Sequence, residues 1–306
     1  MLTSVHIVVV TWNQAALLER CVSSISAAAH ESNIKVAVAI VDNASGPESY
    51  ARISKLSIPA HWALIFLDHN IGYAAALNAG CRALAGEPSD YTVLLNDDCI
   101  LPQNFFSALD AHILGANQPA VIGFPVRDSI GERQRVLFGM RYWPQIGLAV
   151  PVLQPEKATS KQGLGQPLVY PCGAAIACRT DFLTAIGGVP ATNFLYFEEL
   201  QLIKSAAARR EATTLCRSLQ ITHIGGASTS HLPRIMSAHY FATLAALRFT
   251  LAHYPVWLPT VFLARALGTL QRMAKEGSIT PSQSFVAAIR EFLRRPRAQS
   301  GQTNNA

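Results

Sequence analysis

The stretch Val5-His6-Ile7-Val8-Val9-Val10 decides the fold of this chain. Its nearly continuous β-branched residues suit a strand that is buried on both faces, as in a parallel sheet. Thr11-Trp12-Asn13 follow this run, and a helical pattern comes next, with one apolar face formed by Leu18, Cys21, Val22, Ile25 and Ala29. The sequence therefore predicts a strand, a loop and a helix in that order.

The same unit recurs along the first hundred residues. Apolar runs at 36–41, 64–67 and 91–95 are followed by Asp42-Asn43-Ala44-Ser45-Gly46-Pro47, Asp68-His69-Asn70-Ile71-Gly72 and Asn96-Asp97-Asp98. Apolar strands that alternate with helical segments indicate an α/β fold with a mostly parallel central sheet, covered on both faces. Ligands of such sheets bind beyond the carboxyl ends of the strands, where all four polar clusters fall. One such cluster could be an ordinary polar loop, but four of them indicate a ligand site.

The rest of the chain is less regular. Residues 127–166 are rich in Gly, Pro and Gln, and we expect an insertion or a flexible loop region there. We also expect a strand over 168–179, a loop running into a helix over 194–208, a short strand at 221–223, and helices near 235–252, 257–275 and 282–293.

Composition and charge limit the classes of function. Half of the 306 residues are hydrophobic and 14% are charged, against roughly 25% in an average soluble domain, so a disordered chain is excluded. From Lys204 onward, 13 Lys and Arg stand against 3 Asp and Glu, whereas the preceding part has 12 against 16. A basic C-terminal third that ends in Arg294-Arg295-Pro296-Arg297 suits an anionic membrane surface or phosphorylated substrates. Without a recognisable binding motif, we expect no nucleic acid partner.

The cysteines and the apolar segments indicate the cellular compartment of the protein. The six cysteines are scattered, with no Cys-x-x-Cys pair: Cys21, Cys81, Cys99, Cys172, Cys178 and Cys216. We expect buried thiols in a reducing compartment. The apolar stretch 256–270 is short and carries Pro259 and Arg265, so we expect no spanning helix. These features predict a cytoplasmic protein, with peripheral contact to the inner face of the membrane as a further expectation.

Several kinds of catalytic site are excluded by motif. The chain has no Gly-x-x-x-x-Gly-Lys-Ser/Thr phosphate loop, no His-Glu-x-x-His zinc helix and no Gly-x-Ser-x-Gly nucleophile turn. Its first strand also lacks the Gly-x-Gly-x-x-Gly turn of dinucleotide-binding enzymes. Asn96-Asp97-Asp98 instead puts carboxylates at the end of a buried strand, where hard oxygen ligands suit Mg²⁺ or Mn²⁺ together with substrate phosphates. The alternative is a helix N-cap ahead of Pro102.

The order of the motifs resembles glycosyltransferase family 2, the group with the GT-A nucleotide-sugar fold, and in particular its rhamnosyltransferase-like branch. In the first part of the chain the resemblance is carried by Val9-Val10-Thr11-Trp12-Asn13, Val41-Asp42-Asn43-Ala44-Ser45, Asn70-Ile71-Gly72-Tyr73-Ala74, Asn78-Ala79-Gly80 and Leu94-Leu95-Asn96-Asp97-Asp98. Later it is carried by Cys172-Gly173-Ala174-Ala175, Gly187-Gly188, Phe194-Leu195-Tyr196-Phe197-Glu198-Glu199-Leu200 and His223-Ile224-Gly225-Gly226-Ala227-Ser228.

The resemblance implies two domains and a set of donor contacts. It implies a GT-A catalytic domain over 1–230, with a nucleotide-sugar half at about 1–100 and an acceptor half at about 101–230. A helical C-terminal extension with a basic tail would occupy 231–306. Thr11 and Asn13 would line the nucleotide pocket, and Asp42, followed by Asn43, would read the pyrimidine base through its N3–H.

The remaining donor residues follow from the same resemblance. Asn70, Gly72 and Asn78 would hold the ribose or diphosphate side, and Gly72 allows close approach of the backbone. Asn70 and Asn78 have an alternative role as ordinary loop and cap residues. Asn96 and Asp97 would occupy the first two positions of a DxD-like motif on the donor side.

The metal and the general base also come from the resemblance. Asp98 would bind Mg²⁺ or Mn²⁺, and His223 would ligate the metal or bind the diphosphate, with a purely structural histidine as the alternative. Glu198-Glu199 replaces the usual Glu-Asp of the family. Glu199 matches the position of the base that takes the proton of the acceptor hydroxyl, and Glu198 stays a candidate. Gln201 stands where a further Asp is common, so the substrate contacts of that turn depart from the family pattern.

The function implied is that of an inverting, metal-dependent glycosyltransferase. It would move a sugar, with rhamnose from a dTDP donor favoured over a UDP-linked one, to a saccharide or lipid-linked saccharide in cell-surface polysaccharide synthesis. Leu244 and Ala245 occupy places where the family often has Arg and Asn, so acceptor contacts from that helix depart from the family pattern. The alternatives are a sugar nucleotidyltransferase, or a degenerate GT-A subunit that binds or assembles without catalysis. A homodimer is a further alternative for the C-terminal helices.

Overall fold

The computed structural model describes residues 1–130, 133–157, 165–224 and 234–294. The chain divides into two compact units, Met1–Pro144 with Leu148–His231, and Gln145–Gly147 with Leu232–Ala306. We call them unit 1 and unit 2. The glycines at 225 and 226 of the last motif, and the tail arginines at 295 and 297, lie outside the described residues.

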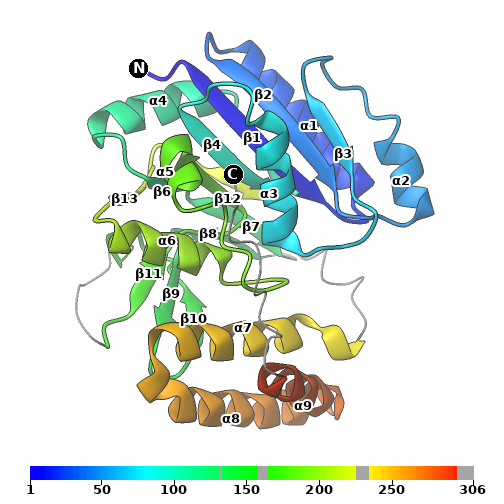
Figure 1. Ribbon diagram of the computed structural model, residues 1–306, viewed down its shortest axis with the longest axis vertical. Helices are drawn as coiled ribbons and strands as arrows, with labels where there is room; N and C mark the ends of the chain where they lie inside the picture. The colour runs from blue at the N-terminus through cyan, green and yellow to red at the C-terminus, as the bar shows by residue number, and fades with distance from the viewer. Residues whose placement is uncertain (131–132, 158–164, 225–233, 295–306) are drawn as a thin grey trace, which may run out of the picture. The chain divides into compact units, whose positions relative to one another are not determined.

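Unit 1 is built around a seven-stranded sheet in the order β13-β6-β12-β4-β1-β2-β3 (Figure 1). Its strands are β1 (Ser4–Thr11), β2 (Lys35–Asp42), β3 (Ala63–Phe66), β4 (Tyr91–Asn96), β6 (Val121–Gly123), β12 (Ala175–Arg179) and β13 (Thr213–Leu215). The strands β1 to β4 are parallel to one another, β13 is parallel to β6, and β12 runs antiparallel to both β4 and β6. The predicted α/β fold with a mostly parallel sheet is confirmed.

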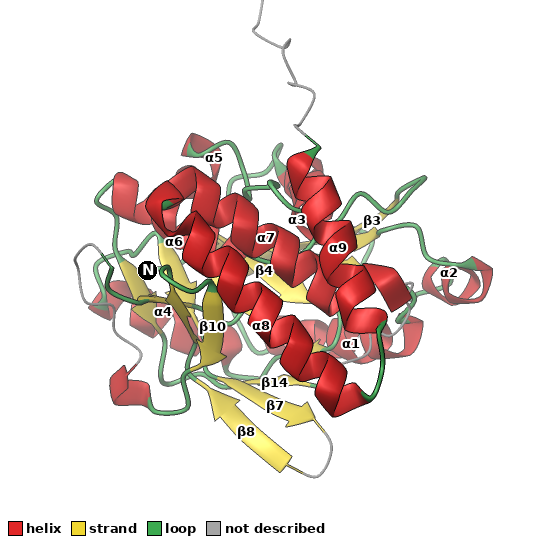
Figure 2. Ribbon diagram, turned by 90° about the horizontal axis from the view of Figure 1, so that it is seen from below, coloured by secondary structure: helices red, strands yellow, loops and turns green. Residues whose placement is uncertain are grey.

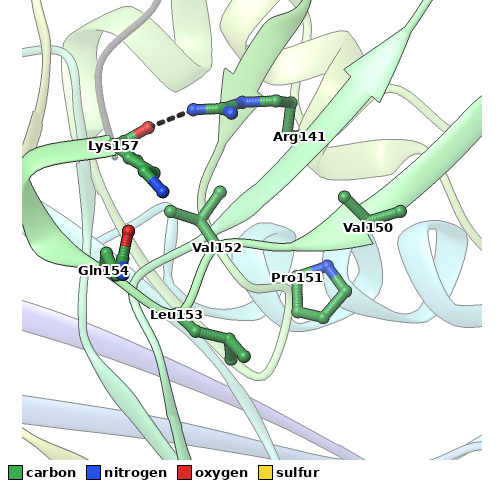
Figure 3. A pocket seen from close by; sticks show the side chains of 7 residues that line it. All are labelled: Arg141, Val150, Pro151, Val152, Leu153, Gln154 and Lys157. Atoms are coloured by element: carbon green, nitrogen blue, oxygen red, sulfur yellow. Dashed lines mark hydrogen bonds between the residues drawn. The ribbon is translucent and has the colours of Figure 1, made fainter.

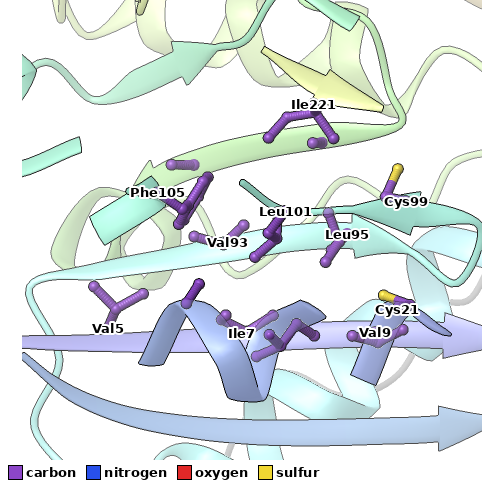
Figure 4. Packing of buried hydrophobic residues seen from close by; sticks show 14 of the residues in the cluster. Val5, Ile7, Val9, Cys21, Val93, Leu95, Cys99, Leu101, Phe105 and Ile221 are labelled. Atoms are coloured by element: carbon purple, nitrogen blue, oxygen red, sulfur yellow. The ribbon is translucent and has the colours of Figure 1, made fainter. Parts of the chain in front are cut away.

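Helices cover both faces of this sheet, as the sequence predicts. They are α1 (Ala15–His30), α2 (Pro47–Ile53), α3 (Tyr73–Leu84), α4 (Phe105–Gly115), α5 (Thr180–Ala185) and α6 (Glu198–Ala208). Val5, Ile7 and Val9 of β1 pack in one buried cluster with residues of α1 and α4 (Figure 4). The alternate residues Val8 and Val10 pack in a second cluster with α3, α5 and α6. The side chains of β1 therefore contribute to two hydrophobic cores, one on each face of the sheet.

The flexible loop expected over 127–166 is wrong, because more than half of the described residues of this region lie in strands. They are β7 (Val126–Ile130), β8 (Arg133–Leu137), β9 (Met140–Trp143) and β10 (Leu148–Pro151), followed by a 3-10 turn at Pro155–Lys157. β7 and β8 join β5 (Cys99–Ile100) and β14 (Ile221–His223) in a sheet of order β5-β14-β7-β8. An apolar pattern does not reveal these strands, because they are short and because β7 buries a polar residue, Asp128, beside Val126.

The single strand expected over 168–179 is also wrong. The segment forms β11 (Leu168–Tyr170), which pairs with β9 in the sheet β10-β9-β11, and β12, which lies in the central sheet. Pro171 has no backbone N–H for a strand ladder, and a turn at Gly173 follows it. These residues divide the apolar run between two sheets.

Unit 2 consists of α7 (Ala238–His253), α8 (Leu258–Glu276) and α9 (Thr280–Leu293), with short 3-10 turns at Arg234–Met236 and Pro255–Trp257. The three helices match those expected from periodicity to within a few residues. Leu244 and Ala245 of α7 are buried, so both serve the packing of this unit. Within the described residues, every helix is too short or too polar to cross a bilayer.

We predict that Gly80→Ala lowers the free energy of unfolding. A Cβ at Gly80 of α3 would lie 2.4 Å from Val8 Cγ1 and 3.1 Å from Val41 Cγ2, inside the second cluster. Overpacking costs about 1–3 kcal/mol and outweighs the gain of about 1 kcal/mol in helix propensity. Urea unfolding measures the difference. The control is Gly115→Ala in α4, where a Cβ meets nothing within 4 Å, and this variant should be no less stable than the parent. Equal stability of both variants would contradict the prediction.

Candidate functional site

The loops that follow β1 and β2 are tied together by hydrogen bonds. The backbone N–H of Asn13 donates to Ser45 Oγ at 2.8 Å, and the N–H of Gly46 donates to Asn13 Oδ1 at 2.7 Å. Asn13 and Ala44 both have positive φ angles, near 60°, which L-residues seldom adopt. The two loops are therefore held in one specified conformation beside the ends of their strands.

The loop that follows β3 is attached to this pair through amide side chains. Asn43 is buried, and its Nδ2 donates to Asn70 Oδ1 at 2.9 Å, while its Oδ1 accepts from the N–H of Ile71 at 3.0 Å. Asn70 Oδ1 also accepts from the N–H of Gly72 at 3.0 Å. Asn43 and Asn70 thus position the loops that the sequence predicts to contact the donor.

The start of α3 connects these loops to β4 and to the segment before α6. Tyr73 donates its hydroxyl to Asn96 Oδ1 at 2.6 Å and its backbone N–H to the carbonyl of Phe194 at 2.9 Å. Gly72 has a φ of +85°, and a Cβ there would lie 2.6 Å from the Phe194 carbonyl oxygen. Gly72 is therefore required for backbone packing, whatever contact it makes with a ligand.

Two acids at the strand ends, Asp42 and Asp97, are buried, and the pKa of each carboxyl is raised. Asp42 accepts from the N–H of Ser45 at 3.1 Å, and burial raises the pKa of its carboxyl. Burial raises the pKa of Asp97 to about 7, with the charge of Asp98 adding to the effect and the Thr11 hydroxyl opposing it. Among the described residues, Asp97 Oδ2 accepts no hydrogen bond. Thr11 is itself buried at the end of β1, beside these groups.

His223 lies between two buried carboxylates. Its Nε2 is 3.2 Å from Asp98 Oδ1, and its Nδ1 is 3.2 Å from Asp128 Oδ1. The small sheet fixes this arrangement, because His223 pairs with Cys99 of β5 on one side and with Asp128 of β7 on the other. Burial lowers the pKa of His223, but the two carboxylates outweigh it and the net pKa is raised. The two carboxylates therefore favour the protonated form of the ring.

Asp128 is a site residue that the sequence reasoning missed. It lies in the region that we expected to be an insertion or a flexible loop. The structure shows an alternation over 126–128, where Val126 and Asp128 are buried and Arg127 between them is exposed. A carboxylate on the inward face of a strand needs a partner, and His223 supplies one.

Asp98 and His223 are the residues of this site that could hold a divalent cation. No group of three or more His, Cys, Asp and Glu arranged to hold a metal occurs within the residues that the structure describes. One carboxylate and one imidazole nevertheless fit a cation whose other ligands are substrate phosphates and water. The unsatisfied oxygen of Asp97 adds acidic character beside them. The donor set suits Mn²⁺ and Mg²⁺ only as part of a complex with a phosphorylated ligand.

Glu198 and Glu199 begin α6 after a strained segment. Tyr196 and Phe197 both have left-handed φ angles, 73° and 75°, directly before the helix. Glu198 is buried, whereas Glu199 is partly exposed and lies against Gly173, where a Cβ would be 1.8 Å from Glu199 Oε1. The strained turn and the glycine together fix the Glu199 carboxylate.

The two glutamates belong to the same cluster as the strand-end acids. Burial raises the pKa of Tyr73 well above its usual value, and the charges of Glu198, Glu199 and Asp98 raise it further. Burial raises the pKa of Glu199 to about 7, and burial together with the charge of Glu199 raises that of Glu198. One edge of the sheet thus carries an acid with a pKa near neutrality beside groups suited to a phosphate and its counterion.

Asn78, which the sequence assigns to the donor site, makes its hydrogen bonds to the turn after α5. Its Nδ2 donates to the carbonyl of Val189 at 2.8 Å, and its Oδ1 accepts from the N–H of Val189 at 2.7 Å. Gly188 packs against this amide, since a Cβ there would lie 2.5 Å from Asn78 Oδ1. Asn78 therefore attaches α3 to the turn after α5, as a loop-positioning residue does.

A separate shallow pocket of about 290 Å³ lies on the three-stranded sheet (Figure 3). Its floor includes Arg141, which donates to the carbonyl of Lys157 at 2.6 Å. The pocket is lined by Arg141, Val150, Pro151, Val152, Leu153, Gln154 and Lys157. None of these is among the predicted site residues, so the strand-end cluster remains the candidate site.

Comparison with solved structures supports the fold. The chain matches the S. aureus TarS 1–349 crystal structure in complex with UDP-GlcNAc, with a TM-score of 0.58 and 13% identity, over 95% of this chain and 81% of that one. It matches the mannosyltransferase PcManGT from Pyrobaculum calidifontis, in complex with GDP-Man and Mn²⁺, with a TM-score of 0.50 and 16% identity over 95% and 81%. At these identities the likeness concerns the fold. No curated protein matches the sequence.

Comparison with family models concerns the sequence itself. The model of Glycosyl transferase family 2 matches residues 6–183, which is more than half of the chain. The matched range includes β1 to β4 and the strand-end acids Asp42, Asp97 and Asp98. The chain therefore belongs to glycosyltransferase family 2 and has the GT-A fold.

Proposed function

We propose that the protein transfers a sugar from a nucleotide diphosphate donor to a hydroxyl group of an acceptor, with inversion at the anomeric carbon. The observation that carries this proposal is the shared location of Glu199 and the strand-end acids around Tyr73. A proton acceptor with a pKa near neutrality then lies beside groups that suit a diphosphate and its cation. Family membership supports the reaction type.

The donor is assigned to the edge formed by the ends of β1 to β4. Thr11, Asn13 and Asp42 are proposed to line the nucleotide pocket, with Asp42 accepting from the pyrimidine N3–H. Asn43 and Asn70 position this pocket through their amide contacts. UDP-GlcNAc and GDP-Man in the two solved neighbours support a nucleotide-sugar donor. We favour dTDP-rhamnose, on the sequence resemblance to the rhamnosyltransferase-like branch.

The residues proposed to hold Mg²⁺ or Mn²⁺ are Asp98 and His223, with Asp97 and Asn96 beside them. A cation bound there supplies countercharge to the departing diphosphate. Asp128 keeps the His223 ring in place through Nδ1, which leaves Nε2 directed toward Asp98.

Glu199 is proposed to take the proton of the acceptor hydroxyl. The hydroxyl oxygen forms a bond to the anomeric carbon, the bond from that carbon to the diphosphate oxygen breaks, and the electron pair leaves with the nucleotide diphosphate. The proton ends on the Glu199 carboxylate. A pKa of about 7 lets this group be charged before the reaction and protonated after it near neutral pH. The burial of Glu198 favours Glu199, which is partly exposed, as the base.

The acceptor is proposed to be a saccharide, free or lipid-linked, in cell-surface polysaccharide synthesis. Turnover of purified protein with a panel of nucleotide sugars, an oligosaccharide acceptor and Mn²⁺ tests the proposed function. Release of the nucleotide diphosphate with a new glycosidic bond supports it. Release of pyrophosphate would indicate a nucleotidyltransferase instead, and donor binding without transfer or hydrolysis would indicate a binding subunit.

We predict that Asp98→Ala removes the Mn²⁺-dependent part of donor binding and leaves the fold intact. The carboxylate faces His223 and contributes no apolar packing, so thermal unfolding should change little. Titration calorimetry with the nucleotide sugar, with and without Mn²⁺, measures the effect. Glu31→Ala provides the control, because Glu31 is an exposed acid at the C-terminal end of α1 and lies outside the strand-end clusters. Parental Mn²⁺ dependence in Asp98→Ala would show that the metal assignment is incorrect.

We predict that Glu199→Gln keeps donor affinity and lowers the transfer rate by about two to four orders of magnitude, the usual scale for loss of a general base. Glu198→Gln should have a smaller effect, because this side chain is buried. Steady-state rates at saturating donor and acceptor provide the measurement. The opposite ranking of the two variants would assign the base to Glu198.

We predict that Glu199→Gln stabilises the protein at high pH. The carboxyl has a pKa near 4.5 when unfolded and about 7 when folded, so its ionisation destabilises the folded state increasingly as the pH rises between these values. At about 1.4 kcal/mol per pKa unit, we expect a gain of about 3.5 kcal/mol at most, reached above pH 7 and absent near pH 4. Urea unfolding across this range measures it. Glu48→Gln, at an exposed first-turn glutamate of α2, should show no such gain.

A further inference from the structure

The helix α8 exposes its most apolar face to solvent. Leu263, Leu267 and Leu270 share one face and are 58%, 51% and 60% exposed. The rest of this face is also apolar, and its members are Pro259, Ala266 and Ala274. A helix that packs on a hydrophobic core normally turns such a face inward. We therefore expect this apolar face to be covered by a partner other than the core of unit 2.

The opposite face of α8 is more polar and makes the contacts within unit 2. Val261 and Thr269 are buried there, and Thr269 Oγ1 lies 2.9 Å from His239 Nε2 of α7. Arg265 lies on the same side, and its carbonyl accepts from the Thr269 hydroxyl at 2.7 Å. Val261 and Thr269 therefore mark the side of α8 that packs within unit 2, and the leucines lie on the other side.

The helix α9 adds a second apolar row beside the first. Val286 and Leu293 are spaced by seven residues, share one face and are exposed, and Ile279 continues the row at the start of the helix. The rings of Phe262 in α8 and Phe285 in α9 lie 5.7 Å apart, so the two helices are adjacent. Figure 2 shows α8 and α9 side by side in front of α7. We call the exposed apolar faces of both helices the α8–α9 face.

The surroundings of the α8–α9 face are cationic. Residues 258–294, which include α8 and α9, contain five Lys and Arg against two Asp and Glu. Both acids lie near arginines, Glu276 at 3.5 Å from Arg272, and Glu291 at 3.4 Å from Arg294. Lys275 of α8 and Arg290 of α9 are exposed as well. Positive charge therefore remains in excess around the apolar rows.

We propose that the α8–α9 face docks on an anionic lipid bilayer. Exposed leucines enter the boundary between headgroups and acyl chains, and the cations contact the lipid phosphates. A second copy of the chain fits less well, because a symmetric contact through this face would bring two cationic borders together. An anionic surface matches both the apolar rows and their charge. The inference does not depend on the proposed sugar transfer.

Vesicle flotation of the full chain tests the docking surface. The unmodified protein should float with vesicles containing phosphatidylglycerol, less with phosphatidylcholine alone, and less again as salt is added. The triple variant Leu263→Gln, Leu267→Gln, Leu270→Gln should lose at least about tenfold in binding, since three buried apolar side chains are removed. A variant with Leu114→Gln and Leu153→Gln, two exposed leucines of unit 1, should bind as the parent does.

A charge variant and the oligomeric state complete the test. Lys275→Ala, Arg290→Ala and Arg294→Ala together should abolish the preference for anionic vesicles, with thermal unfolding unchanged because these side chains are exposed. Parental binding by the leucine variant would overturn the proposal. So would the absence of flotation of the unmodified protein at low salt. A stable dimer without vesicle binding, lost in the leucine variant, would assign the face to a second copy of the chain.

Discussion

The parallel pairing of β1 with β2 on one side and with β4 on the other is the constraint on which the site depends. The register sets Thr11 beside Asp42 and Val10 beside Asn96, so the three strands end at one edge. Because β1 feeds a hydrophobic core on each face, a slip of one residue would exchange the side chains of both cores. Apolar packing therefore specifies where the polar site residues lie.

The same edge concentrates acids where their charged forms are costly. Asp97 and Glu199 have pKa values raised to about 7 by burial, and His223 compensates only the charge of Asp98 and Asp128. A protein selected for stability alone would place apolar residues here. The acids are tolerated because the cores on both faces of the sheet and the strained turn before α6 hold them in place. A ligand that brings a cation would relieve part of this electrostatic cost.

Sequence alone predicts β1 to β4 of the central sheet, because buried parallel strands are continuous apolar runs, and it predicts the strand-end loops, because their polar clusters follow those runs. It does not predict β6 and β13, which have three residues each. It does not give the strands of residues 127–157, which are short and include the inward carboxylate of Asp128. It does not divide 168–179 between two sheets either. Nor does it tell which asparagines face a ligand: Asn43 and Asn78 are joined to backbone groups that only the folded chain brings near. Long-range hydrogen bonds leave no local pattern.

Unit 2 shows a second property that the hydrophobic periodicity of a sequence does not predict. A helical pattern gives the width of an apolar face but not the direction in which the folded chain turns it, and the stretch 256–270 suits a packed helix as well as a surface helix. In α8 the direction follows from Thr269, which contacts His239 of α7, and from Val261, which packs beside Gly147, so the leucines lie outside. The polar side of α8 is satisfied within the unit, by contacts such as that between Thr269 and His239. The exposed leucines of α8 have no apolar partner within the described part of unit 2. A surface that covers them must supply apolar groups together with negative charge.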